Sequence, residues 1–407
     1  MNSETIAVLR NGALDLWSDG RGTVLLAVAS GWFLSIGVRM IYPVLLPALR
    51  SAYGLDLTTA GLLLTVLFLA YALGQFPGGV LADRFGERTT LTASAVLSAI
   101  TLTLVVTAGS TLVLFVATGL FGFGTALYAI GRYTVLSRLY TERLGAANGV
   151  TAASQDAGQS VLPPLASVIA AASLWQFGYG FVVPLFLLAA GSLWLVVPAR
   201  PPSTSEGGGG FTRDDLATLR SAVRQPPVVY GTVALVLGLA VWQAFTSFYP
   251  TYLVEQKGLS TTLASVLFGG FFALGICIKP LAGAAYDRFG TRRSLLIVAS
   301  GPTVSLAALP LVDGFLPLAG ITALTATLLG FATVLEPSLL RALPADVRGT
   351  GFGILRTVGF TVGATTPVLF GAAADRGFFD AGFVALSALA GGMFLLAFRI
   401  PSPTDSS

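Results

Sequence analysis

The sequence predicts an all-α membrane protein whose twelve transmembrane helices form two pseudo-symmetric six-helix bundles. Three observations lead to this fold class. Hydrophobic residues make up 54% of the chain and charged residues only 10%, whereas an average soluble domain holds about 25% charged residues. Apolar stretches of about 20 residues, the length that crosses a bilayer, recur throughout the chain. A short polar motif also occurs twice, half a chain apart, which indicates an internal duplication.

The repeated motif reads GGVLADRFGER over residues 78–88 and AGAAYDRFGTRR over residues 282–293. Its two acidic residues, Asp83 and Asp287, lie 204 residues apart (287 − 83). The same offset relates four further pairs: Gly79 and Gly283, Arg84 and Arg288, Gly86 and Gly290, and Arg88 and Arg292. Each copy lies between two long apolar stretches, so both copies are expected in loops at the membrane surface.

Twelve stretches are apolar and long enough to be membrane spans. In the first half they cover residues 22–48, 57–81, 90–109, 112–137, 146–172 and 178–198. In the second half they cover residues 228–252, 261–285, 294–311, 316–338, 351–373 and 381–399. Residues 199–227 contain PPSTSEGGGG, a composition typical of a flexible linker. We therefore predict a bundle over 1–198, a cytoplasmic linker over 199–227 and a second bundle over 228–407.

The distribution of basic residues predicts the orientation. If the N-terminus is cytoplasmic, most Arg residues fall on inner segments, and the outer loops hold only Arg50, Lys257 and Arg376. This asymmetry follows the positive-inside rule. We expect a multi-pass protein of the cell membrane (plasma or inner membrane) with both termini in the cytoplasm.

Composition also argues against several functional classes. The net charge is +4, but the basic residues are scattered between apolar spans, so we expect no nucleic-acid partner. The chain has no histidine and a single cysteine, Cys277, so no metal site and no cofactor are predicted. No stretch is long enough for a soluble catalytic domain. The chain is expected to be a transporter rather than an enzyme, and to function as a monomer in the lipid bilayer.

The two motifs resemble the loop signature of the major facilitator superfamily. The twelve spans, the central linker and the 204-residue repeat extend this resemblance over nearly the whole chain. It implies two six-helix bundles around a central cavity, and secondary transport of a small solute by alternating access. We expect an organic anion as the solute, with coupling to protons as a further option.

The resemblance also implies a gating role for the motif. Asp83 would accept hydrogen bonds from the N-terminus of the eleventh span, near Gly349 and Gly351, and Asp287 would do so at the fifth span, near Gly145. These contacts would favour the outward-open state. The gate motif then comprises Gly79, Asp83, Arg84, Gly86, Arg88, Gly283, Asp287, Arg288, Gly290 and Arg292. Alternatively, its arginines only follow the positive-inside rule.

Two arginines within predicted spans are candidate anion ligands. Arg39 lies in the first span and Arg132 in the fourth, and charges inside a membrane are rare unless they serve a function. A guanidinium group matches the geometry of a carboxylate or phosphate. Family members that carry organic anions commonly have an arginine in the first span, and some add one in the fourth. Arg39 would alternatively extend towards the outer interface.

Three further ionisable residues form a pattern across the two halves. Arg132 and Glu336 occupy equivalent positions, and Arg356 lies one turn before the position equivalent to Asp156. Buried ions need partners, so we expect Arg132–Asp156 and Glu336–Arg356 pairs, or an Arg132–Glu336 pair across the halves. An exchange of partners would make a switch, and a protonated Asp156 or Glu336 would couple protons. Purely structural pairs are the alternative.

The remaining candidates are polar and aromatic residues that could line the cavity. They are Tyr71, Gln75, Tyr128, Trp242, Gln243 and Lys279. Lys279 stands where the first half has Gln75, and it could instead extend to the inner interface. The aromatic residues could instead belong to lipid-facing belts.

A proton-coupled exporter of drugs or amphipathic compounds is the alternative function. The drug-efflux branch of the family usually has an arginine in the outer part of the fourth span, where this chain has Thr118. That branch also has a Gly-Pro-rich fifth span, whereas this chain reads DAGQSVLPPLAS. Both departures favour the anion transporter.

Overall fold

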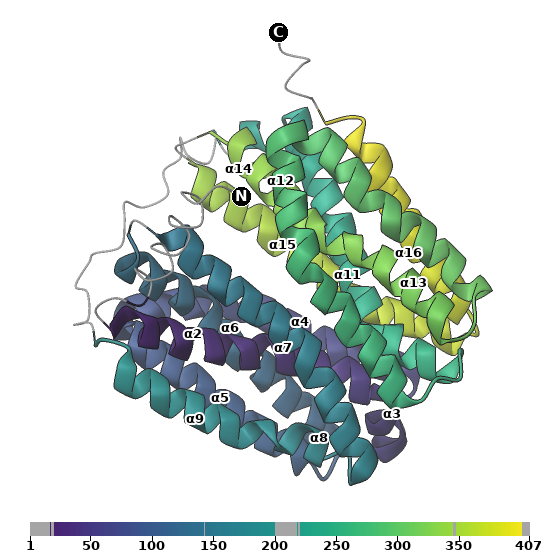
Figure 1. Ribbon diagram of the computed structural model, residues 1–407, viewed down its shortest axis with the longest axis horizontal. Coiled ribbons are helices and arrows are strands. Elements are labelled where there is room, and N and C mark those ends of the chain that lie inside the picture. The colour runs from purple at the N-terminus through teal and green to yellow at the C-terminus, as the bar shows by residue number, and fades with distance from the viewer. Residues whose placement is uncertain are drawn as a thin grey trace, which may run out of the picture. The chain divides into compact units, whose positions relative to one another are not determined.

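The computed structural model describes residues 17, 20–141, 143–199, 218, 220–344 and 347–400, and these residues form helices, turns and no strand (Figure 1). The first half contains α2 (Arg21–Gly37), the 3-10 helix η2 (Val38–Met40), α3 (Ile41–Tyr53), α4 (Leu57–Phe85), α5 (Glu87–Val106), α6 (Thr111–Leu139), α7 (Leu144–Ala172), α8 (Phe177–Gly180) and α9 (Val182–Val196). The predicted first span is thus interrupted at Arg39. Most of the predicted linker, residues 200–217 and 219, lies outside the described residues.

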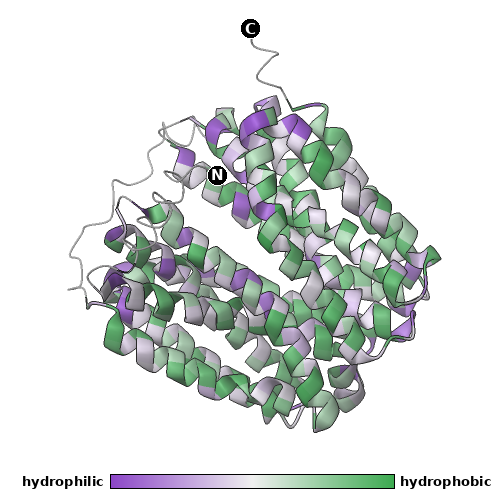
Figure 2. Cartoon of the chain, viewed as in Figure 1, coloured by the Kyte–Doolittle hydropathy of each residue, from purple (hydrophilic) through white to green (hydrophobic). Residues whose placement is uncertain are grey.

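The second half begins with α11 (Pro226–Glu255) and α12 (Thr261–Ala308). It continues with η3 (Leu309–Leu311), α13 (Phe315–Thr325), η4 (Ala326–Gly330), α14 (Phe331–Ala342), α15 (Arg348–Asp375) and α16 (Phe379–Ala397). Each range predicted as a span is helical over most of its length, and Figure 2 shows hydrophobic residues along most of these helices.

Ten helical segments among the described residues are long and apolar enough to cross a membrane. One of them, Thr261–Leu311, covers two predicted spans, which are separated by the non-helical backbone of Gly290 (φ 73°, ψ 179°). The predicted span 146–172 coincides with α7, which is not among the ten. Ser154, Gln155, Asp156 and Gln159 lower the hydropathy of α7. The count of twelve crossings therefore stays a prediction.

Residues at equivalent positions in the two halves cap the starts of helices and form the bends between them. The side chain of Asp56 accepts a hydrogen bond from the Thr59 N–H at the start of α4, at 2.7 Å, and Ser260, 204 residues later (260 − 56), caps α12 through Leu263. Gly86 and Gly290 of the repeated motif have φ angles of 80° and 73°. Glycine adopts this left-handed region readily, whereas other residues rarely do. Both motif copies therefore need a glycine at their bend.

The described helices divide into two compact units. Unit 1 comprises the described residues of Met1–Arg39, Ala70–Leu162 and Gln176–Thr204, and unit 2 those of Met40–Leu69, Pro163–Trp175 and Ser205–Ser407. Unit 2 thus combines α3 and the first part of α4 with the second half of the sequence. In the first half, three helical stretches belong partly to one unit and partly to the other. Their boundaries lie after Arg39, after Leu69 and after Leu162. The change after Leu162 coincides with Pro163 and Pro164 inside α7.

Candidate functional site

Arg39 lies at the break in the first span, and its side chain is buried. Only 6% of the residue is exposed, and its guanidinium carbon lies 3.7 Å from the centroid of the Tyr71 ring in the same unit. Its Nε has no hydrogen-bond partner within the described part of the chain. A buried cation with an unused donor is costly unless an anion binds to it. Burial also argues against the alternative in which Arg39 extends to the membrane surface.

Arg132 on α6 is buried in unit 1 among aromatic residues. Its Nη1 donates a hydrogen bond to Thr151 Oγ1 at 2.6 Å. Its guanidinium carbon lies 4.3 Å from the ring centroid of Trp32 and 4.0 Å from that of Tyr133. A desolvated cation–π contact, such as the one with buried Trp32, contributes about 2 kcal/mol, and a contact with an exposed ring such as Tyr133 contributes about 0.5–1 kcal/mol. The surroundings hold the guanidinium group in place, and its Nε has no hydrogen-bond partner within the described chain.

Contacts between α2 and α7 position Trp32, one of the aromatic residues that surround Arg132. The Trp32 Nε1–H donates to Gln155 Oε1 at 3.1 Å, and Ser154 Oγ donates to the Ala29 carbonyl at 3.0 Å. The helices approach closely there, because a Cβ at Gly37 would lie 2.6 Å from the Gly158 carbonyl group. Small residues permit such contacts between membrane helices. These contacts between α2 and α7 therefore hold Trp32 against Arg132.

Tyr128, which was predicted to line the central cavity, packs against Trp32. It is fully buried, its ring stacks on Trp32 at 6.1 Å, and its hydroxyl donates to the Val28 carbonyl at 2.9 Å. A lipid-facing belt would leave Tyr128 exposed, so that alternative is wrong for this residue. Sequence reasoning missed Trp32, Thr151 and Gln155. The polar run SQD at 154–156 in an apolar stretch was the available signal for Gln155.

The second half brings Glu336 and Arg356 together. Arg356 Nε lies 3.5 Å from Glu336 Oε1, with the two side chains 38% and 30% exposed. This is the pair expected within the second half. Asp156, its counterpart in the first half, is 3% exposed, and its pairing with Arg132 stays a prediction.

The other candidates of unit 2 lie on α11 and α12. Gln243 is buried and donates to the Phe360 carbonyl at 3.4 Å, while its Oε1 has no hydrogen-bond partner in the described chain. The ring of Trp242 lies 6.3 Å from that of Phe68. Lys279 is half-buried, as is Gln75 at the equivalent position in unit 1. Burial alone therefore does not distinguish a role in substrate binding for these two residues.

Each copy of the gate motif lies where one helix ends and the next begins, at Gly86 and at Gly290, and is helical on both sides of that glycine rather than a loop. Asp83, Arg84, Asp287 and Arg288 are exposed. Arg88 packs against Trp194, with its guanidinium carbon 4.1 Å from the ring centroid, and Arg292 lies 5.3 Å from the ring of Phe398. Gly79 and Gly283 each have only one atom near an added Cβ, at 3.5 Å. The contacts expected of Asp83 and Asp287 with the other half stay predictions.

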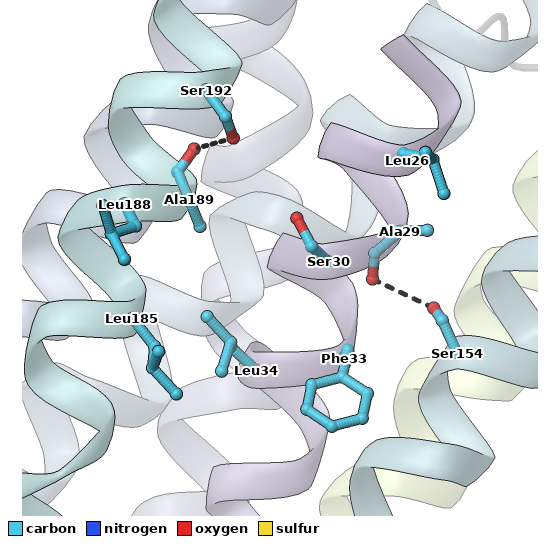
Figure 3. A pocket seen from close by; sticks show the side chains of 10 residues that line it. All are labelled: Leu26, Ala29, Ser30, Phe33, Leu34, Ser154, Leu185, Leu188, Ala189 and Ser192. Carbon is cyan, nitrogen blue, oxygen red and sulfur yellow. Dashed lines mark hydrogen bonds between the residues drawn. The ribbon is translucent and has the colours of Figure 1, made fainter. Parts of the chain in front are cut away.

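Unit 1 also contains an apolar groove between α2, α7 and α9, with a volume of about 560 Å³ (Figure 3). Its lining includes three serines, and their hydroxyls already donate to backbone carbonyls: Ser30 to Ala27, Ser154 to Ala29 and Ser192 to Ala189. The other lining residues are apolar, among them Phe33 and Leu185. The serine hydroxyls of the groove are therefore already used as donors, whereas Arg39 and Arg132 each keep an Nε without a hydrogen-bond partner in the described chain.

The sequence profile of the Major Facilitator Superfamily matches residues 28–364. The fold and the buried charges thus define a membrane transporter, and the chain belongs to the major facilitator superfamily. Two solved structures share its fold at low sequence identity. A bacterial homolog of the human lysosomal transporter Spinster is 16% identical with a TM-score of 0.73, covering 95% of this chain and 99% of that one. The nucleoside transporter NupG is 14% identical with a TM-score of 0.76, covering 93% and 98%.

Several sequence relatives are named as transporters of small solutes. A probable sulfoacetate transporter from Cupriavidus necator is 26% identical, covering 88% of this chain and 89% of the relative. The hexuronate transporter of Bacillus subtilis is 24% identical, covering 86% of each chain. The nitrite extrusion protein of the same organism is 26% identical, covering 89% of this chain and 91% of the relative. The protein is therefore a multi-pass membrane transporter of small solutes, not an enzyme.

Proposed function

We propose that this protein transports a small organic anion by alternating access, and that Arg39 is its principal anion ligand. The observation that carries the proposal is the burial of Arg39 against Tyr71 with Nε unsatisfied. Arg132 supplies a second buried cation, held by Thr151 and Trp32. The relatives named above are described by anionic solutes: sulfoacetate, hexuronate and nitrite. An anion would satisfy donors that the protein leaves open.

The remaining features of the proposal follow from the sequence. The first and second halves, residues 1–198 and 228–407, would act as the two moving bundles, joined by the cytoplasmic linker 199–227. The protein would work as a monomer in the cell membrane with both termini inside. Tyr71, Gln75, Tyr128, Trp242, Gln243 and Lys279 would complete the binding region. Proton coupling, if present, would use Asp156 or Glu336, since no histidine is available.

Ligand-induced thermal stabilisation tests the role of Arg39. Carboxylates, sulfonates, phosphate esters and lipophilic cations would be screened against the purified wild type, Arg39→Ala and Arg39→Lys. A ligand that binds the folded state raises the melting temperature by mass action. We expect an organic acid to stabilise the wild type, Arg39→Ala to show no shift, and Arg39→Lys to show a reduced one, because lysine lacks the planar fork.

The matched control is Arg376→Ala, which removes an exposed arginine at the end of α15. It should keep the ligand-induced shift. Stabilisation by cations alone, unchanged in Arg39→Ala, would overturn the proposal in favour of an exporter of amphipathic compounds.

A further inference from the structure

The start of α4 binds a carboxylate from the far end of the sequence, within unit 2. Asp375 is the last residue of α15. Its two oxygens accept hydrogen bonds from the Leu57 N–H at 2.8 Å and from the Thr58 N–H at 2.7 Å. The Thr58 hydroxyl donates to the same carboxylate. One acidic side chain thus satisfies two of the backbone donors that open the helix.

A carboxylate fits this position for a general reason. The first turn of a helix has free N–H groups and the positive end of the helix dipole. Asp56 already accepts from Thr59, so Leu57 and Thr58 hold the donors that the local cap leaves open. Hydrogen bonds to a charged acceptor are stronger than neutral ones. Asp375 therefore ties the end of α15 to the start of α4.

An ion pair and close backbone packing reinforce this tie. Arg50, near the end of α3, forms an ion pair with Glu255 at the end of α11, and its charge also interacts with Asp375. The Val368 N–H donates to Thr65 Oγ1 at 3.3 Å. A Cβ at Gly61 would contact the Pro367 carbonyl oxygen. Helices from the two halves of the sequence therefore meet tightly on the side predicted to be outer.

We propose that Asp375, with the Leu57 and Thr58 N–H groups and the Arg50–Glu255 ion pair, is an outer latch that must open once in each transport cycle. The latch joins first-half helices α3 and α4 to second-half helices α11 and α15. If the halves separate on the outer side when solute enters or leaves, these contacts break and water replaces them. This role holds for any solute, so it does not depend on the anion proposal.

The latch is not a by-product of the internal duplication. The position equivalent to Asp375 in the first half is Ala171 on α7 (375 − 204). The latch instead involves the same two helices as the contact expected of the gate motif, with their roles exchanged. At the other ends of the same two helices, Asp83 of α4 is expected to meet the start of α15. Asp375 at the end of α15 would then cap the start of α4 when the outer side is closed. Asp83 near the end of α4 would cap the start of α15 when the inner side is closed.

Cysteine accessibility tests the latch without knowledge of the solute. In a Cys277→Ser background, Thr65→Cys places a thiol on α4 at a position that is only 7% exposed. A membrane-impermeant maleimide would be applied to the outer side of oriented vesicles. We expect Asp375→Asn to raise the labelling rate about three- to tenfold, the range that the loss of a charge-assisted hydrogen bond at an exposed rim gives. The charge is lost, while the side chain keeps its size.

The matched control is Asp380→Asn. This nearby exposed carboxylate accepts a hydrogen bond from the Tyr252 hydroxyl at 2.6 Å. It should leave the labelling rate at wild-type level. An unchanged rate in correctly folded Asp375→Asn would overturn the proposal, as would an equal rise in Asp380→Asn.

Charge reversal gives a second, independent series, which decides the matter if Asp375→Asn does not fold. Arg50→Glu alone and Glu255→Arg alone should each raise labelling of Thr65→Cys. The double reversal should bring the rate back towards the wild type, because the ion pair is restored in the opposite sense. Single reversals without effect would overturn the latch.

Discussion

At the residue scale, Arg132 is a buried charge that its neighbours hold in a fixed orientation, as the proposed role in anion binding requires. Thr151 holds one end of its guanidinium group, and Trp32 and Tyr133 cover its faces. Isolated charges in an apolar region are costly. Ordering the group in advance reduces the entropy lost when a ligand binds. The Thr151 hydroxyl should therefore contribute to affinity even if it never touches the solute.

Replacing Thr151 with valine tests this positioning. Valine has nearly the same shape but cannot accept the hydrogen bond from Arg132. Hydrogen bonds to charged groups contribute about 1.5–3 kcal/mol, so anion affinity should fall at least about tenfold. Calorimetric titration of the purified protein would measure it. Thr134→Val is a suitable control, since its hydroxyl bonds only to the Ile130 carbonyl among the described residues. Equal affinity in Thr151→Val and the wild type would argue against the positioning role.

A substitution of Glu336 tests whether this residue carries a coupled proton. Its partner Arg356 is partly exposed, so the protein should tolerate Glu336→Gln. If Glu336 carries the proton, this variant should lose accumulation driven by a pH gradient while keeping solute exchange in the absence of a gradient. Both modes can be measured in proteoliposomes. Gradient-driven accumulation at the wild-type rate would exclude Glu336 as the carrier.

At the element scale, the sequence was sufficient to locate the helices but not their interruptions. Long apolar runs predicted every helical range, because a membrane span must satisfy its backbone internally. The change to 3-10 geometry at Val38–Met40 was not predicted, although Pro43 cannot donate a backbone hydrogen bond to the Arg39 carbonyl four residues earlier. The motif loops expected at Gly86 and Gly290 are each reduced to a bend at one residue with positive φ. Hydrophobic periodicity indicates which face of a helix is apolar, and it does not reveal such local bends.

The candidate site was predictable to the same extent. Arg39, Arg132 and Glu336 were identifiable because an ionisable residue in an apolar stretch is conspicuous. Trp32 and Thr151 were not, because tryptophan and threonine are ordinary in membrane helices. Their role depends on which faces of α2, α6 and α7 meet. That pairing is set by contacts such as Gly37 with Gly158, which only the structure reveals.

Close packing between α4 and α15 yields a prediction at this scale. Gly61→Ala would place a methyl group against the Pro367 carbonyl oxygen. Overpacking typically destabilises an arrangement by about 1–3 kcal/mol, so the outer side should open more often and label faster at Thr65→Cys. The control is Gly270→Ala on α12, where an added Cβ meets no atom within 4 Å. Equal labelling in the two variants would show that this contact does not hold the outer side closed.

At the scale of the whole molecule, the composition and the duplication indicate the class of protein, and the buried arginines are the basis of the chemistry that we propose. The superfamily fold carries many kinds of solute, so it does not identify this one. This chain has a pair of buried arginines in unit 1, of which Arg39 lies at the boundary of the unit. The central claim is therefore that the transported solute is an organic anion bound by Arg39.

Uptake into proteoliposomes tests that claim most directly. A panel of radiolabelled organic acids, including a sulfonate and a hexuronate, would be offered to the wild type, Arg39→Ala and the control Arg376→Ala. The account predicts saturable uptake of at least one acid by the wild type and by Arg376→Ala, and at least about a hundredfold loss in Arg39→Ala, as expected when a charged ligand contact is removed. Uptake that survives in Arg39→Ala, or extrusion of lipophilic cations with no uptake of any acid, would contradict it.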